Sequence, residues 1–157
     1  MKYFLPAFLF CLQIKSFAQV DAIKKASWLV GTWKGMNNGA PFYETWRIQN
    51  DSLVNYTIEI KNNDTIITRQ TSLRSMGQKI VFGKKGDWQL KRITGNEIVL
   101  ENDTSKYSNR IIYLHLANDH WFTILEHPGS TMYYDMEKIR ELDLSIDRLI
   151  DKKYKRL

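Results

Sequence analysis

Residues 110–127 have the sequence RIIYLHLANDHWFTILEH, two apolar runs on either side of the pair Asn118-Asp119. Both runs are rich in β-branched and aromatic residues, which is the composition of strands rather than helices. An Asn-Asp pair between such runs is typical of a tight turn, because both residues tolerate left-handed backbone conformations. The segment therefore predicts two antiparallel strands, 109–117 and 120–127, joined by a short turn.

The same rhythm of strand and turn continues in both directions along the chain. Turn signals rich in Asn, Asp and Gly recur mostly every 8–16 residues, which favours an antiparallel barrel or sandwich over βαβ units. Ser52–Lys61 alternates most regularly, with Val54, Tyr56 and Ile58 on one face and Asn55 and Thr57 on the other. The pattern predicts ten strands: 31–36, 41–49, 53–61, 65–75, 79–83, 87–93, 97–101, 109–117, 120–127 and 131–138.

Ten sequential strands in an open sheet would leave two unpaired edges that recruit other chains. Closure into an up-and-down barrel removes both edges, and a barrel of this size has room for a small ligand. We therefore expect an all-β fold, an antiparallel barrel of about ten strands. A short helix over Asp21–Leu29 precedes it, with Ile23, Ala26 and Leu29 on one face.

The two ends of the chain differ from the barrel segment. Lys2, an apolar run over 3–12 and Ser16-Phe17-Ala18 form the pattern of a secretory signal peptide, so we expect residues 1–18 to be removed and the barrel domain to span 19–138. Residues 139–157 carry dense mixed charge and an apolar stripe typical of an amphipathic helix. This segment is either a helix packed on the barrel, a helix that binds a partner, or a tail. The stripe contains Ile139, Leu142, Ile146 and Leu149.

Charge and cysteine content limit the compartment and the partners. Loss of the leader leaves 21 basic and 17 acidic residues and removes Cys11, the only cysteine, which suits an exported protein without disulfides. The leader ends in Phe-Ala-Gln, which is typical of bacteria, so we expect a periplasmic or extracellular location. The basic excess is spread along the chain, so neither a nucleic-acid partner nor a membrane-spanning segment in the mature protein is expected. We expect a monomer.

The segment Trp28-Leu29-Val30-Gly31-Thr32-Trp33 after a short helix resembles the opening of lipocalin-like barrels in the calycin superfamily. With Tyr43-Glu44-Thr45-Trp46 and Arg110-Ile111-Ile112-Tyr113, the chain is most similar to an uncharacterised bacterial family of secreted lipocalin-like domains. The nitrobindins, which bind haem, share the Gly-Thr-Trp opening. The loop at 103–109 departs from that family, which usually has proline there.

Physical arguments assign roles to the opening motif. Gly31 lets the chain turn sharply out of the helix, and Trp33 then fills the closed end of the barrel. The resemblance implies a basic side chain over the Trp33 ring, from either Arg110 or Lys138, in a cation–π contact. We therefore interpret Gly31, Trp33 and Arg110 as a structural motif.

A second set of residues is predicted to contact a ligand: Glu44, Trp46, Tyr56, Arg69, Trp88, Tyr113 and Trp121. Glu44 and Trp46 share a strand face. If that face points inward, Glu44 is a buried carboxylate that needs a partner, such as Arg69, Arg47 or Tyr113. It then either anchors a ligand in a ring-lined pocket or forms a structural pair between neighbouring strands.

Three functions follow from these patterns. The first is a barrel that binds a small apolar or amphipathic molecule. The second is an envelope protein-interaction module with a filled barrel. The third, suggested by the nitrobindin likeness, is haem binding through His127; His115, His120 and His127 do not converge on a zinc site. No nucleophile–base motif or phosphate loop is present, so we predict neither an enzyme nor a required cofactor.

Overall fold

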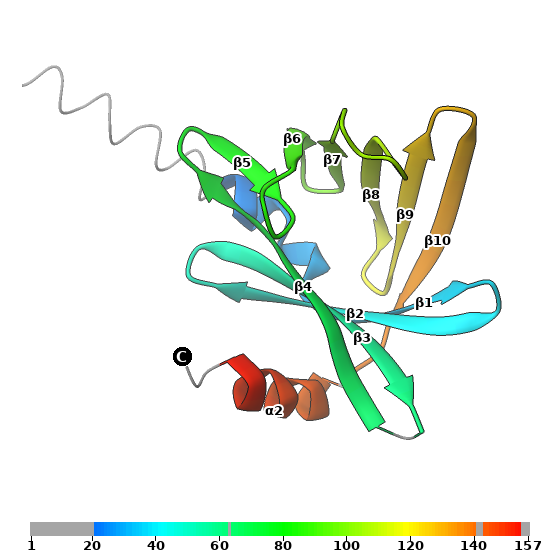
Figure 1. Ribbon diagram of the computed structural model, residues 1–157. Helices are drawn as coiled ribbons and strands as arrows, with labels where there is room; N and C mark the ends of the chain where they lie inside the picture. The colour runs from blue at the N-terminus through cyan, green and yellow to red at the C-terminus, as the bar shows by residue number, and fades with distance from the viewer. Residues whose placement is uncertain (1–20, 63, 141–142, 155–157) are drawn as a thin grey trace, which may run out of the picture.

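The computed structural model describes residues 21–62, 64–140 and 143–154. The expected signal peptide, 1–18, lies outside the described residues. Residues 21–25 are helical, and they lead into the 3-10 helix η1 (Ser27–Leu29) and ten strands (Figure 1). The elements after η1 are β1 (Gly31–Asn37), β2 (Ala40–Gln49), β3 (Ser52–Lys61), β4 (Asp64–Met76), β5 (Lys79–Phe82), β6 (Trp88–Ile93), β7 (Glu97–Glu101), β8 (Arg110–Ala117), β9 (His120–His127), β10 (Ser130–Lys138) and α2 (Asp143–Tyr154).

The strands form a closed antiparallel barrel in which each strand pairs with its neighbours in sequence and β10 pairs with β1. The predicted all-β barrel is confirmed, and every predicted strand agrees with the structure to within one residue at each end. Turn chemistry explains part of this agreement. In the turn between β2 and β3, Asn50 and Asp51 have φ values of 46° and 57°, the left-handed backbone conformation that a type I′ two-residue hairpin turn requires at both central residues.

The barrel closes unevenly where β10 meets β1 and where β4 meets β5, because the pairing there is short. β10 pairs with β1 only at Trp33 and Lys34, and β5 pairs with β4 only over Leu73–Met76. Strands β1–β4 and β5–β10 therefore diverge as two halves (Figure 1). Between β1 and β10, the divergence is bridged by Phe42 and Tyr134, whose rings meet edge to face at 5.3 Å.

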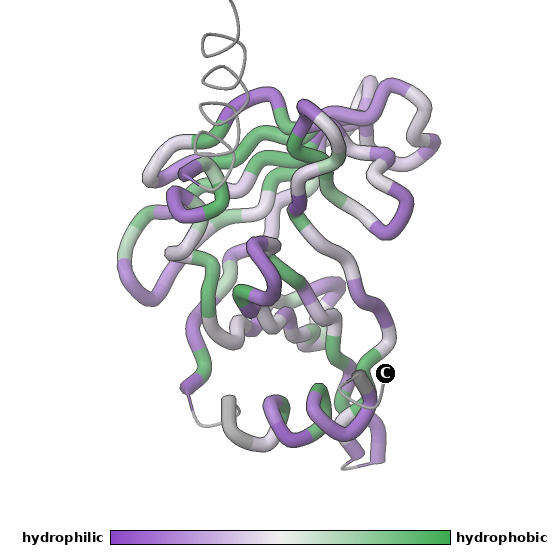
Figure 2. Tube along the Cα trace, turned by 90° about the vertical axis from the view of Figure 1, so that its left-hand side faces the viewer, coloured by the Kyte–Doolittle hydropathy of each residue, from purple (hydrophilic) through white to green (hydrophobic). Residues whose placement is uncertain are grey.

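One end of the barrel is filled by side chains. Trp33 and Trp121 are fully buried there, and their rings meet edge to face at 5.9 Å. Trp33 donates from Nε1 to the carbonyl of Leu29 at 2.7 Å, which ties η1 across this end. Figure 2 shows hydrophobic residues gathered where the strands lie together and hydrophilic residues on the turns.

A second apolar cluster lies outside the barrel, beneath α2. The outward face of β3 and β4 packs against Ile146 and Ile150, which are 1% and 3% exposed. Arg47 donates from Nε to Asp147 at 2.8 Å, and Lys153 Nζ donates to the carbonyl of Ile67 at 2.9 Å. The C-terminal segment is thus a helix packed on the barrel.

The boundaries of this C-terminal element differ from the predicted stripe. Ile139 precedes α2 and its backbone N–H bonds the carbonyl of Thr32 at 2.8 Å, whereas Leu142 lies outside the described residues. Ile150, which the stripe omitted, is buried in the outer cluster with Ile146. In the described part of the chain, no helix has the length and apolar character needed to span a membrane.

Candidate functional site

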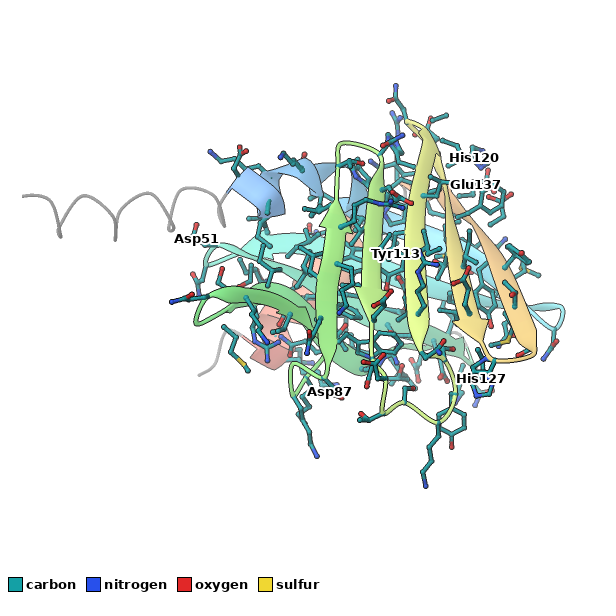
Figure 3. All side chains as sticks on the ribbon, turned by 90° about the horizontal axis from the view of Figure 1, so that it is seen from above. Asp51, Asp87, Tyr113, His120, His127 and Glu137 are labelled. Carbon is teal, nitrogen blue, oxygen red and sulfur yellow. The ribbon has the colours of Figure 1, made fainter. Side chains whose placement is uncertain are left out.

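A cavity of about 520 Å³ lies inside the barrel, at the end opposite Trp33. Figure 3 shows this end at Asp87 and His127, with His120 and Glu137 at the other end and Tyr113 between them. Both halves of the barrel contribute to the cavity wall, so its shape follows from their divergence. The lining residues are Asn37, Phe42, Glu44, Asn55, Thr57, Arg69, Thr71, Phe82, Gly83, Lys84, Asp87, Trp88, Ser105, Tyr107, Ser108, Ile111, Tyr113, Thr123, Leu125 and Tyr134.

The half formed by β5–β10 supplies an aromatic wall. Phe82, Trp88 and Tyr113 line it, and Phe82 meets Tyr113 nearly perpendicularly at 6.4 Å. Behind this wall, Trp46 stacks on Phe82 at 6.0 Å and meets the edge of Tyr113 at 5.8 Å. Edge-to-face and offset contacts are the favourable arrangements of aromatic rings, so the wall is held in place before any ligand enters.

The half formed by β1–β4 supplies a polar wall, because polar residues occupy the inward positions of β3 and β4. Asn55 pairs with Thr71 and Thr57 pairs with Arg69 across these strands. Thr71 donates to Asn55 Oδ1 at 3.4 Å, and Arg69 Nε donates to Thr57 Oγ1 at 3.4 Å. A continuous polar surface therefore faces the rings across the cavity.

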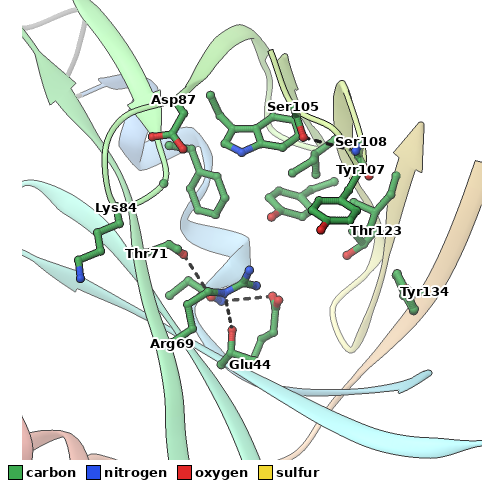
Figure 4. A pocket seen from close by; sticks show the side chains of 18 of the residues that line it. Glu44, Arg69, Thr71, Lys84, Asp87, Ser105, Tyr107, Ser108, Thr123 and Tyr134 are labelled. Carbon is green, nitrogen blue, oxygen red and sulfur yellow. Dashed lines mark hydrogen bonds between the residues drawn. The ribbon is translucent and has the colours of Figure 1, made fainter. Parts of the chain in front are cut away.

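Glu44 of β2 lies at the floor between the two walls (Figure 4). Its Oε2 accepts hydrogen bonds from Trp46 Nε1 and from Asn55 Nδ2, each at 3.2 Å. Its other oxygen, Oε1, accepts no hydrogen bond from the residues that the structure describes. The half-buried carboxylate therefore has one oxygen held by the protein and one available to a donor in the cavity.

Burial raises the pKa of Glu44 above its ordinary value of 4.5, and the charge of Arg69 together with the hydrogen bonds from Trp46 and Asn55 offsets only part of this rise. Burial also raises the pKa of Tyr113 well above 10.0, with a further contribution from the Glu44 charge. Tyr113 is therefore a neutral phenol at physiological pH. Its hydroxyl is both a donor and an acceptor.

Four of the seven residues predicted to contact a ligand line the cavity: Glu44, Arg69, Trp88 and Tyr113. Two others, Trp46 and Trp121, lie in the core behind the wall, where they are 1% and 0% exposed. Trp46 acts on the cavity through Glu44, to which it donates a hydrogen bond. Trp121 supports Tyr113, whose ring it meets edge to face at 5.1 Å.

Tyr56, the remaining residue predicted to contact a ligand, does not line the cavity. Tyr56 is fully buried in the outer cluster beneath α2, with Val54 and Ile58. The apolar face of β3 points out of the barrel, where α2 covers it. The inward face is the polar one, which carries Asn55 and Thr57.

Of the two cations expected over Trp33, Arg110 or Lys138, Arg110 does not lie there. Lys138 lies there, with Nζ 5.0 Å from the ring centroid, because β10 closes on β1 with Lys138 opposite Trp33. Arg110 instead donates to Glu126 Oε2 at 3.0 Å. Gly31 has a φ of 133°, a conformation that favours glycine. A Cβ there would lie 2.8 Å from Lys138 Cε, near the flexible end of that side chain, so the backbone conformation rather than space restricts this position to glycine.

The sequence interpretation missed the polar wall, namely Asn55, Thr57 and Thr71, and also Phe82 and Lys84. One signal was available for β3. Its alternation gave one polar and one apolar face, and the C-terminal stripe required an apolar surface to cover. Joining these two observations assigns the apolar face of β3 to the helix and the polar face to the interior.

None of the three histidines lines the cavity. His115 stacks on Trp28 at 4.9 Å, His120 lies 3.5 Å from Asp135, and His127 contacts the carbonyl of Pro128 at 3.0 Å. Within residues 21–62, 64–140 and 143–154, no three His, Cys, Asp or Glu side chains are grouped as a metal site requires.

Comparison of the chain with family models, with curated proteins and with solved structures finds no match. The function is therefore inferred from the geometry of the cavity.

The raised pKa of Glu44 predicts a dependence of stability on pH. Because the folded-state pKa lies above the ordinary value of 4.5, the unfolded chain loses this proton first as pH rises, and stability falls from pH 4.5 until the folded-state pKa is passed. Glu44→Gln removes the charge, so we expect the variant to be more stable than the wild type at neutral pH and equal to it well below pH 4.5. Urea unfolding at both pH values measures the difference.

The control is Glu97→Gln. Glu97 is paired with Arg92 on the outside of the barrel at 2.6 Å, and its neutralisation is expected to leave stability at neutral pH unchanged or slightly lower. A Glu44→Gln variant that is less stable than the wild type at neutral pH would contradict the assignment.

Proposed function

We propose that the protein binds a small molecule with an apolar, ring-sized body in the barrel cavity. The observation that carries this proposal is a cavity of about 520 Å³ with a rigid aromatic wall facing a polar wall. Ligand sites are typically concave, mostly apolar and supplied with a few convergent polar groups. The resemblance of the opening motif to lipocalin-like barrels supports the same proposal.

The polar groups in the cavity match an amphipathic ligand. Glu44 Oε1 is available to accept a hydrogen bond, and the neutral hydroxyl of Tyr113 is available to donate or accept one. A ligand stacked on Trp88 and Phe82 would bury its rings and direct a polar group to these oxygens. In this proposal, the cavity binds and orients the ligand, without a chemical step.

The alternatives receive less support from the same geometry. An interaction module with a filled barrel requires an interior packed throughout, but the end opposite Trp33 contains the cavity. Haem held through a histidine requires an imidazole in the wall, but His127, the last residue of β9, does not line the cavity. With the expected leader, the binding proposal describes a carrier or receptor of the bacterial envelope.

The binding proposal is tested with a neutral fluorescent probe, N-phenyl-naphthylamine, whose emission rises in an apolar site. We expect saturable binding to the wild type and loss of binding by Thr123→Phe, because Thr123 lines the cavity and the larger ring fills it. Native mass spectrometry and an absorbance scan of protein from its own envelope identify a co-purifying ligand or haem.

The matched control is Thr131→Phe, which makes the same change at an exposed position of β10 that does not line the cavity. It is expected to bind the probe as the wild type does. Equal binding by Thr123→Phe and Thr131→Phe, or no binding by the wild type, would overturn the proposal.

A further inference from the structure

A second hollow, of about 570 Å³, lies beside the edge of β4. We call it the basic groove; it is lined by Thr68, Arg69, Gln70, Thr71, Ser72, Arg74 and Lys84. Five of these residues are consecutive in β4 and alternate between its two faces, so the groove runs along the strand edge. This is the stretch of β4 that does not pair with β5.

The lining of the groove is positively charged and rich in hydrogen-bond donors. Three of its seven residues are basic, three carry hydroxyl groups and none is acidic. Arg74 is fixed by bonds from Nη1 to the carbonyl of Gly83 at 2.6 Å and to Ser72 Oγ at 2.9 Å. This arrangement holds the loop that carries Lys84 next to β4.

The other two cations are available to a ligand. The Arg69 guanidinium makes one hydrogen bond to the described residues, from Nε to Thr57, and neither Arg69 nor Lys84 forms an ion pair with a described carboxylate within 4.0 Å. Both residues are exposed. Hydrogen bonds from such cations to an anion are stronger than those between neutral groups.

The groove is continuous with the barrel cavity, because Arg69, Thr71 and Lys84 line both. Figure 4 shows Arg69 and Thr71 on one strand of the cavity wall, with Lys84 on a neighbouring loop. The acidic lining residues, Glu44 and Asp87, belong to the cavity and not to the groove. The charge of the lining residues therefore changes from mixed in the cavity to positive in the groove.

We propose that the ligand is an amphipathic anion, whose apolar body fills the cavity and whose anionic group lies in the basic groove beside Arg69 and Lys84. The inference rests on the proposed binding function and adds the charge and the orientation of the ligand. Carboxylate, sulfonate and phosphate groups share the chemistry that the groove recognises. A neutral ligand of the same shape would leave the groove unused.

The test compares two probes with the same ring system. Anilinonaphthalene sulfonate carries an anionic group, whereas N-phenyl-naphthylamine lacks it. In low salt, we expect the wild type to bind the sulfonate about tenfold more tightly, and Arg69→Met to lose that preference, measured as the ratio of its affinities for the two probes. High salt is expected to reduce the preference, because Arg69 and Lys84 are exposed to screening.

Two variants and a competitor complete the experiment. Arg69→Lys should restore part of the preference, and Arg92→Met, outside both hollows, should keep all of it. Equal affinity of the wild type for the two probes, or a preference that survives Arg69→Met, would overturn the proposal. Binding of the neutral probe by the wild type separately tests the proposed binding function, so the two failures are distinguishable. Displacement of the sulfonate probe by inorganic phosphate alone, at submillimolar concentration, would show a free-anion site and also overturn it.

Discussion

Trp33→Ala is expected to lower the free energy of unfolding by about 3–5 kcal/mol, the range for removal of a fully buried tryptophan. Trp33 is 0% exposed and forms three specific contacts: a hydrogen bond to Leu29, an edge contact with Trp121 and the cation of Lys138 above its ring. A domain of this size is stable by about 5–15 kcal/mol, so the loss is a large share of the total. Urea unfolding followed by circular dichroism measures it.

The matched control is Trp88→Ala, the same change in a half-buried residue of the cavity wall. It is expected to cost clearly less stability, because less apolar surface leaves water at that position on folding. Trp33→Phe keeps most of the buried ring and gives a measurable midpoint if the alanine variant does not fold. Equal losses from Trp33→Ala and Trp88→Ala would contradict the structural role of Trp33.

Ile146→Ala is expected to lower the free energy of unfolding by about 2–3 kcal/mol, the lower part of the range for a buried isoleucine. Ile146 is 1% exposed and packs in the outer cluster with Tyr56 and Ile58. The lower part of the range applies because α2 lies on the outside of the barrel, where neighbouring side chains are able to move into the space that the missing atoms leave. Probe binding should be unchanged, because none of these residues lines the cavity.

Arg148→Ala is the control for the helix, since Arg148 is exposed on the same element. We expect it to change stability by less than about 0.5 kcal/mol. If Ile146→Ala abolished probe binding while the fold was retained, the separation between the outer cluster and the cavity would be wrong.

The strand pattern was predictable from sequence because it is encoded locally. Turns such as Asn50-Asp51 contain the residues that a left-handed turn conformation requires, and the segments between them alternate with a period of two. Closure into a barrel followed from the number of strands and the need to pair their edges. These features do not depend on which distant residues meet.

The site was only partly predictable, because it depends on long-range pairing. Lys138 reaches Trp33 through the closure of β10 on β1, and the sequence contains no signal for that register. The position of Tyr56 depends on a helix that begins 87 residues later, at Asp143. Glu44 was identified from the sequence because Glu44 and Trp46, two positions apart, share one face of β2.

Alternate residues of β3 lie in two different environments. Asn55 and Thr57 face the cavity, whereas Tyr56 and Ile58 lie beneath α2. Substitutions at the first pair of positions alter the chemistry of the cavity wall and leave the helix contact intact. If the cavity binds a ligand as proposed, its ligand preference is therefore able to diverge during evolution, or in a designed library, without loss of the apolar contact that keeps the helix in place.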